Sequence, residues 1–171
     1  GLYYAGARGA WLGYLGGLPF FFFHKSKRNF LLVGLGAIIT LTAFYQFSPR
    51  VKKIFTSRSV SNEKRLAFWS GAIKAWQEKP ILGYGYKNYE PNSVALKTKY
   101  KLPYADVQAN AHSNFLETLA TSGALGLLAF LLFQGFWFFE NKFFSAFVAS
   151  FSISGQVQLT WGDGENLFLI L

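Results

Sequence analysis

The chain lacks cysteine, and this absence excludes disulfide bonds and thiolate metal sites without fixing a cellular compartment. It also lacks methionine, begins at Gly1 and stops within the apolar run 166–171, so we expect a fragment of a longer protein. Its two histidines form no His-x-x-His pair, and no Ser-His-Asp set is present. Redox chemistry at sulfur is therefore excluded.

Charged residues are almost absent from several long stretches of a chain that is 51% hydrophobic and 20% aromatic. A helix needs about 20 apolar residues, within a range of roughly 17–25, to cross a membrane. Four stretches qualify or nearly qualify: 2–23, 30–47, 118–139 and 143–162. The sequence therefore predicts an all-α integral membrane protein with about four transmembrane helices, part of a larger polytopic fold, because so little polar chain could not cover four buried helices.

Short connections between these stretches predict the topology. The turn 24–28 carries three Lys or Arg and the connection 140–142 carries one lysine, so both are predicted to be cytoplasmic. The chain then divides into two transmembrane helices at 1–47, an extracytoplasmic (periplasmic) loop at 48–122, and two further helices with the start of another at 118–171. Long loops translocate largely regardless of charge, so the basic loop does not contradict this topology.

Acidic residues are scarce, with eight Asp and Glu against 17 Lys and Arg. The loop 48–122 holds 12 of the basic residues and five of the acids, a net charge of +7. Such a loop favours anionic partners such as phosphates or membrane lipids, although lysines that only solubilise a loop beside anionic lipid explain many of the charges. Nucleic acid is not an expected partner of a loop held between membrane spans.

An amphipathic helix is predicted within the loop at about 62–78, before Pro80. Its apolar stripe contains Trp69, Ala72, Ile73 and Trp76, with Arg65 one turn earlier. Two tryptophans on one face are typical of a helix at the membrane interface, which would hold the Arg65 guanidinium at head-group depth. The alternative is a helix packed on the rest of its own loop.

The stretch 81–92, ILGYGYKNYEPN, predicts a turn-rich loop rather than regular secondary structure, and 100–110 continues it. Gly83 and Gly85 are not followed by a third properly spaced glycine, and no strand–helix unit surrounds them. A dinucleotide-binding fingerprint is therefore a poor interpretation.

His112 lies between Asn110 and Asn114, either of which could cap the helix that follows. Asn114 and Glu117 have the N-x-x-E spacing of a capping box. A helix N-terminus disfavours protonation of a nearby imidazole, and a neutral histidine beside an anion site is what a general base requires. The alternative is a structural histidine that only hydrogen-bonds the loop.

Arg8 lies near the end of the first apolar stretch, where an arginine costs free energy unless it snorkels or has a partner. By the predicted topology, Arg8, Arg65 and His112 lie on one extracytoplasmic face, and the two guanidinium groups could grip a diphosphate. Asp163 and Glu165 reach the same face and have oxygen ligands that suit Mg²⁺ or Mn²⁺. Helix capping or solvation explains that acidic pair equally well.

Four motifs in order carry a resemblance to a known family. They are ARGAWLGYLGG (7–17), R-x-x-x-W-x-x-A-I-K-A-W (65–76), PILGYG (80–85) and AHSNFLETLATSGALGLLAFL (111–131). Together they resemble the C-terminal half of the O-antigen ligase and O-antigen polymerase family. The resemblance implies a multi-pass, GT-C-type glycosyltransferase of the bacterial inner membrane with its active face in the periplasm.

The resemblance also implies a reaction without metal or cofactor. Members take a glycan from an undecaprenyl diphosphate carrier and transfer it to lipid A core or to a carrier-linked glycan. By motif, Arg8 and Arg65 would bind the donor diphosphate and His112 would act on the acceptor hydroxyl, while the missing upstream spans imply that this segment alone is inactive. From the residues themselves two alternatives stay open: a membrane transporter or channel, and a non-catalytic membrane scaffold that binds anionic lipid or glycan.

Overall fold

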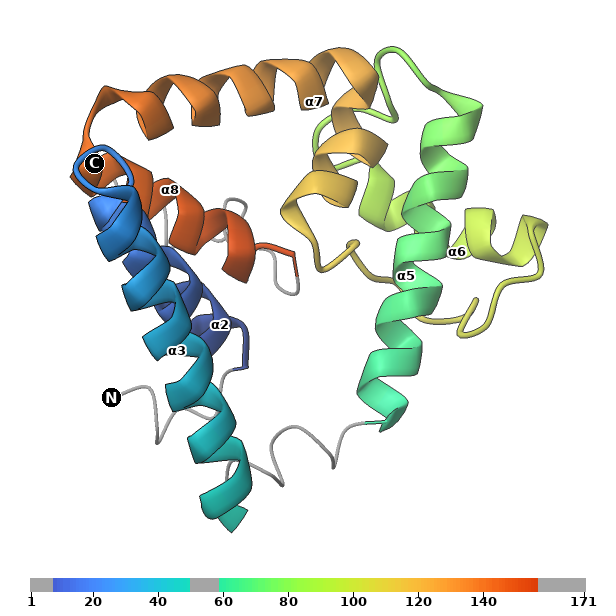
Figure 1. Ribbon diagram of the computed structural model, residues 1–171. Coiled ribbons are helices and arrows are strands. Elements are labelled where there is room, and N and C mark those ends of the chain that lie inside the picture. The colour runs from blue at the N-terminus through green and yellow to red at the C-terminus, as the bar shows by residue number, and fades with distance from the viewer. Residues whose placement is uncertain (1–7, 50–58, 157–171) are drawn as a thin grey trace. The chain divides into compact units, whose positions relative to one another are not determined.

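The computed structural model describes residues 8–49 and 59–156. These residues form two compact units, one from 8–49 and 133–154, the other from 59–132 and 155–156. Every regular element in the described ranges is a helix (Figure 1). The predicted all-α class is therefore confirmed for this part of the chain.

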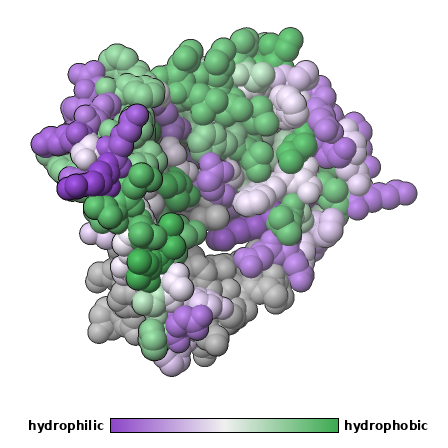
Figure 2. All heavy atoms as spheres, in the orientation of Figure 1, coloured by the Kyte–Doolittle hydropathy of each residue, from purple (hydrophilic) through white to green (hydrophobic). Residues whose placement is uncertain are grey.

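Two described helices, α3 (Lys27–Phe47) and α7 (Asn114–Glu140), are long and apolar enough to cross a membrane. The 21 residues of α3 would extend about 30 Å, the thickness of the hydrocarbon core. Their apolar side chains are open to the surroundings: Leu31 of α3 is 67% exposed and Leu132 of α7 is 65% exposed. Figure 2 shows hydrophobic side chains gathered over α7. Apolar faces of this extent suit lipid better than water.

The other two predicted spans are shorter than the sequence suggests. In place of one helix over 2–23, α2 (Arg8–Gly17) is followed by a 3₁₀ turn, η1 (Leu18–Phe22). The proline in the first turn of η1 has no N–H group with which to continue an α-helical ladder. In place of 143–162, α8 (Lys142–Ser154) has 13 residues, about 20 Å. The count of four spans thus stays a prediction.

In the first unit, α2 and α8 pack at unusually short range through small residues. A Cβ added to Gly13 would lie 2.7 Å from the carbonyl oxygen of Ser150 and 2.9 Å from Cβ of Ser154. One added to Gly17 would lie 2.7 Å from Cβ of Ser150 and 2.8 Å from the carbonyl oxygen of Ala146. Small residues four apart on both helices allow the close backbone approach by which membrane helices associate.

The second unit consists of α5 (Ser59–Glu78), α6 (Tyr89–Lys99) and the first part of α7. Its core contains Ala72, Ala75, Tyr89, Leu96, Ala111 and Ala120. Helix α6 occupies part of the stretch for which the sequence predicts a turn-rich loop, so that prediction was wrong for these residues. Glu90 in its first turn and Lys97 and Lys99 in its last turn complement the helix dipole.

The buried face of α5 is rotated from the predicted apolar stripe. Phe68, Ala72 and Ala75 are buried, whereas Ile73 is 39% exposed and the two tryptophans are only half-buried. The smaller side chains allow close packing on α6 and the loop, and the larger apolar ones stay at the surface. The helix therefore packs on its own loop, and the orientation of its outer stripe toward a membrane stays a prediction.

Helix α7 is broken at Gly123, whose φ of 65° and ψ of −164° are not helical. The segment 80–85, directly after α5, inserts its backbone at this break (Figure 1). Four hydrogen bonds join the two: Tyr84 N–H to Ala120 O (2.9 Å), Gly85 N–H to Thr121 O (2.7 Å), Ala124 N–H to Pro80 O (2.8 Å) and Leu125 N–H to Ile81 O (3.3 Å). A Cβ on Gly83 would lie 2.5 Å from the carbonyl carbon of Thr121. The segment 80–85 and the break in α7 therefore both need a glycine for this close backbone approach.

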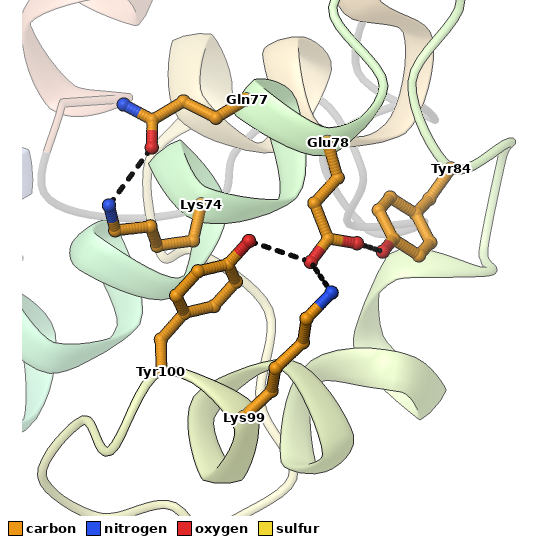
Figure 3. A network of polar contacts seen from close by, with 6 residues as sticks. All are labelled: Lys74, Gln77, Glu78, Tyr84, Lys99 and Tyr100. Carbon is orange, nitrogen blue, oxygen red and sulfur yellow. Dashed lines mark hydrogen bonds and ion pairs between the residues drawn. The ribbon is translucent and has the colours of Figure 1, made fainter.

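A polar network holds the same segment to the ends of α5 and α6 (Figure 3). The Glu78 carboxylate accepts hydrogen bonds from Lys99 Nζ (2.7 Å), Tyr84 Oη (2.5 Å) and Tyr100 Oη (2.9 Å). These three donors stabilise the charged form and lower the pKa of Glu78 to about 2. Because Tyr84 also pairs with the break in α7, the network supports the junction from the loop side.

Candidate active site at the start of helix α7

His112 lies in a strained turn directly before α7. Its φ of 48° is in the left-handed region, which few residues other than glycine adopt and which often marks a functional position. Asn110 Oδ1 accepts the backbone N–H of His112 at 2.9 Å, and Glu117 Oε2 accepts the N–H of Ala111 at 2.7 Å. The turn is therefore held by a side chain on each side.

These contacts correct the predicted helix cap. Asn114 is the first residue of the helix, not its cap, and the Glu117 carboxylate bonds to Ala111 instead of closing a box with Asn114. The Asn114 N–H donates to the carbonyl of Gly155 at 2.7 Å, so Gly155 of the same unit lies beside this turn. Asn114 itself is only 1% exposed, and its burial makes the turn part of the core rather than a frayed helix end.

The His112 ring is half-buried and packs against Phe68 of α5, with ring centroids 5.7 Å apart. Phe68 is 5% exposed, and Lys97 Nζ lies over its ring at 4.7 Å from the centroid. Lys97 is 1% exposed and donates to the carbonyl oxygens of Tyr104 and Val107. A buried lysine therefore fixes the phenylalanine against which the histidine rests, an arrangement for which the sequence contains no signal.

His112 is biased toward its neutral form. Burial is the main cause that lowers the pKa of His112 from 6.5, the nearby Arg65 guanidinium adds to it, and the Glu90 carboxylate opposes it. The sequence predicts this direction, but from the helix N-terminus. The structure instead assigns it to burial and to an arginine from a different helix.

Of the three residues predicted to act together, the structure brings two into the same unit. Arg65 is half-buried on α5, one turn before Phe68, and its charge acts on His112. Arg8 is the first residue of α2 in the other unit, and its side chain lies outside the described residues. The joint grip of Arg8 and Arg65 on a diphosphate therefore stays a prediction.

The acidic pair at the end of the fourth predicted span, Asp163 and Glu165, also lies outside the described residues. Within residues 8–49 and 59–156, no group of three or more His, Asp or Glu side chains is arranged to hold a metal ion. The metal alternative, which rests on Asp163 and Glu165, thus stays untested.

A cavity of about 660 Å³ opens beside the His112 turn. Its walls come from the start of α6 and the residues just before it, from the loop before His112, and from α7 on both sides of the break. They consist of Tyr86, Lys87, Glu90, Pro91, Gln108, Asn110, Asn114, Glu117, Thr118, Thr121, Ser122 and Phe130. Glu90 is absent from the sequence-based candidates because it lies in a stretch predicted to have no regular structure.

The family model described as O-antigen ligase matches residues 1–131. This match covers more than half of the chain and includes Arg8, Arg65 and His112. The chain belongs to the O-antigen ligase family. No curated protein and no solved structure matches the chain.

Membership confirms the resemblance carried by the four motifs. O-antigen ligase family members are membrane proteins that perform glycan transfer of the ligase or polymerase type, with lipid-linked glycan and polysaccharide or lipid A partners. The exposed apolar faces of α3 and α7 agree with a membrane location. The break at Gly123, the pairing with 80–85 and the His112 turn all lie within the matched residues.

Proposed function

We propose that this chain carries the acceptor-activating centre of a membrane glycosyltransferase. The enzyme takes a glycan from an undecaprenyl diphosphate carrier and transfers it to an acceptor hydroxyl during surface polysaccharide assembly. Neutral His112 removes the hydroxyl proton, and the hydroxyl oxygen attacks the anomeric carbon with inversion. The bond from that carbon to the diphosphate breaks, and the diphosphate leaves with the electron pair.

One observation carries this proposal: a half-buried histidine in a strained turn, with its pKa lowered by burial and by an arginine close enough to act on it. A general base must be unprotonated at the working pH, and negative charge that develops on a departing diphosphate is stabilised by a fixed cation. Arg65 is suited to this task because guanidinium keeps its charge and donates paired hydrogen bonds to phosphate oxygens.

The proposed place of the chemistry is the periplasmic face of the bacterial inner membrane. The support is the predicted topology, in which the loop 48–122 follows a cytoplasmic turn and an apolar helix. Family membership favours an enzyme over the transporter and scaffold alternatives. In addition, no charged residue lies between Arg28 and the end of α3 or between Glu117 and Glu140. An ion pathway would require charged residues within such spans.

The test is complementation in a strain that lacks its own copy, with the full-length protein that contains this chain. His112→Ala should abolish glycan transfer on a surface-glycan gel, at a protein level equal to wild type. Normal transfer by this variant would refute the base assignment. A ladder lost entirely from the acceptor would indicate ligation, and a ladder reduced to single repeat units would indicate polymerisation.

Arg65 variants separate charge from geometry. Arg65→Lys keeps the positive charge but loses the paired hydrogen bonds, so transfer should fall about tenfold or more if the guanidinium grips a diphosphate. A scaffold that binds anions through charge alone should tolerate the change. Lys101→Arg, at an exposed position on the same loop, is the matched control and should transfer normally.

A further inference from the structure

The cavity beside His112 has lining chemistry that differs from that expected of a diphosphate site. Its charged side chains are two carboxylates, Glu90 and Glu117, against one ammonium group, Lys87. Arg65 does not contribute to the walls. A diphosphate would meet net negative charge in this space, and like charges in a partly enclosed site repel.

The same lining suits a sugar. Carboxylate oxygens accept hydrogen bonds from hydroxyl groups, and amides such as those of Asn110 and Gln108 both donate and accept. The Tyr86 ring at the rim offers an apolar face on which the C–H face of a sugar ring can pack. The volume of about 660 Å³ falls within the roughly 300–1,000 Å³ typical of small-molecule sites.

The cavity also lies where an acceptor would have to enter. Asn110 and Asn114 line it, and each is two residues from His112 in the chain. Glu117 lines it too and is fixed by the Ala111 N–H, so this wall and the His112 turn form one hydrogen-bonded piece. Glu90 and Arg65 both act on His112, with opposite electrostatic sign, and only Glu90 belongs to the cavity wall.

We infer that this cavity binds the saccharide part of the acceptor, with the Glu90 carboxylate accepting sugar hydroxyls and the Tyr86 ring packing on a sugar face. The inference rests on the proposed function, since it names the partner that His112 would deprotonate. It assigns the donor diphosphate to the Arg65 side and the acceptor sugar to the Glu90 side. Acceptor specificity would then reside in the segment 86–90 and in the loop before His112.

The test measures binding and transfer separately, with the full-length protein in lipid nanodiscs. The probe is the lipid-free oligosaccharide released by mild acid from the host strain's own surface glycan, titrated by calorimetry. Glu90→Gln keeps size but removes the charge, and it should weaken binding about tenfold or more, as loss of a charge-assisted hydrogen bond does. Tyr86→Ala, at a side chain 77% exposed, should weaken it without affecting folding. Glu63→Gln, the same chemical change at an exposed position outside the cavity, should bind like wild type.

Two results would overturn the inference: wild-type affinity in both Glu90→Gln and Tyr86→Ala, or displacement of the oligosaccharide by inorganic pyrophosphate. His112→Ala distinguishes this failure from failure of the proposed function. That variant should bind the oligosaccharide with wild-type affinity while losing transfer. If it kept transfer, the base assignment would fail, and the binding data for Glu90→Gln would still decide the inference.

Discussion

Gly123→Ala tests whether the break in α7 is the structural junction between the loop and the apolar helix. The backbone there has φ 65° and ψ −164°, a region essentially restricted to glycine, and alanine would add about 2 kcal/mol of strain. Its Cβ would also lie 2.3 Å from the carbonyl oxygen of Ile81, so the segment 80–85 would have to move away.

Displacement of that segment would break the hydrogen bonds from Ala124 and Leu125 to Pro80 and Ile81, at about 1 kcal/mol each. With the strain, local opening would become easier by about 4 kcal/mol, roughly a thousandfold in the opening equilibrium. Hydrogen exchange measures this quantity directly, since exchange of a protected amide follows its local opening. The amides of Tyr84, Gly85, Ala124 and Leu125 should exchange much faster in the variant.

Gly135→Ala is the control on the same helix. A Cβ at Gly135 meets nothing within 4 Å, so these four amides should exchange at the wild-type rate in that variant. The reasoning would be refuted if the amides kept wild-type protection in Gly123→Ala. Glycan transfer by Gly123→Ala should decrease together with the protection of these amides from exchange, because Thr121 and Ser122 at the break also line the cavity beside His112.

Four further variants test other parts of the structure. Glu78→Gln should lower thermal stability at pH 7, and its deficit should vanish as pH falls from about 4.5 to about 2, because Glu78 has a lowered pKa in the folded state and stabilises it only while ionised. Lys97→Met should cost about 1–3 kcal/mol by removing the hydrogen bonds to the carbonyl oxygens of Tyr104 and Val107 and leaving the latter without this donor, measured by thermal melting against Lys101→Met. Gly17→Leu should lower the melting temperature far more than Gly36→Leu, since a Cβ at Gly36 meets no atom within 4 Å. The acid limb of the pH–rate profile should lie below pH 6.5 in wild type and move upward in Arg65→Gln, as the positive charge that disfavours His112 protonation is removed.

The predictions that agree with the structure rest on local pattern. Long uncharged runs such as 30–47 identify an apolar helix regardless of its neighbours, because its backbone hydrogen bonds close within the helix itself. The four ordered motifs identify the family. The neutral bias of His112 was also predictable in direction, although its cause was not.

The predictions that failed depend on contacts between distant segments. Helix α6 was missed because Gly and Tyr before it suggest turns, while its stability comes from burying Tyr89 and Leu96 against α5. The buried face of α5 was misplaced because the larger Trp and Ile side chains define the most hydrophobic stripe, whereas close packing selects Ala72 and Ala75. Pattern alone cannot state which face a neighbour will cover.

The sequence by itself determined that the chain is helical, apolar enough for a membrane and a member of a glycan-transferring family, because periodicity and composition are local properties. Only the tertiary structure decided that Arg65 and Phe68 of α5 meet His112, and that a cavity with Glu90 on its wall opens beside it. Those contacts join residues more than 20 positions apart, and the glycine at the break in α7 separately lets the backbone of 80–85 approach. Burial, together with the charge of Arg65 from α5, rather than any single motif, lowers the pKa of His112.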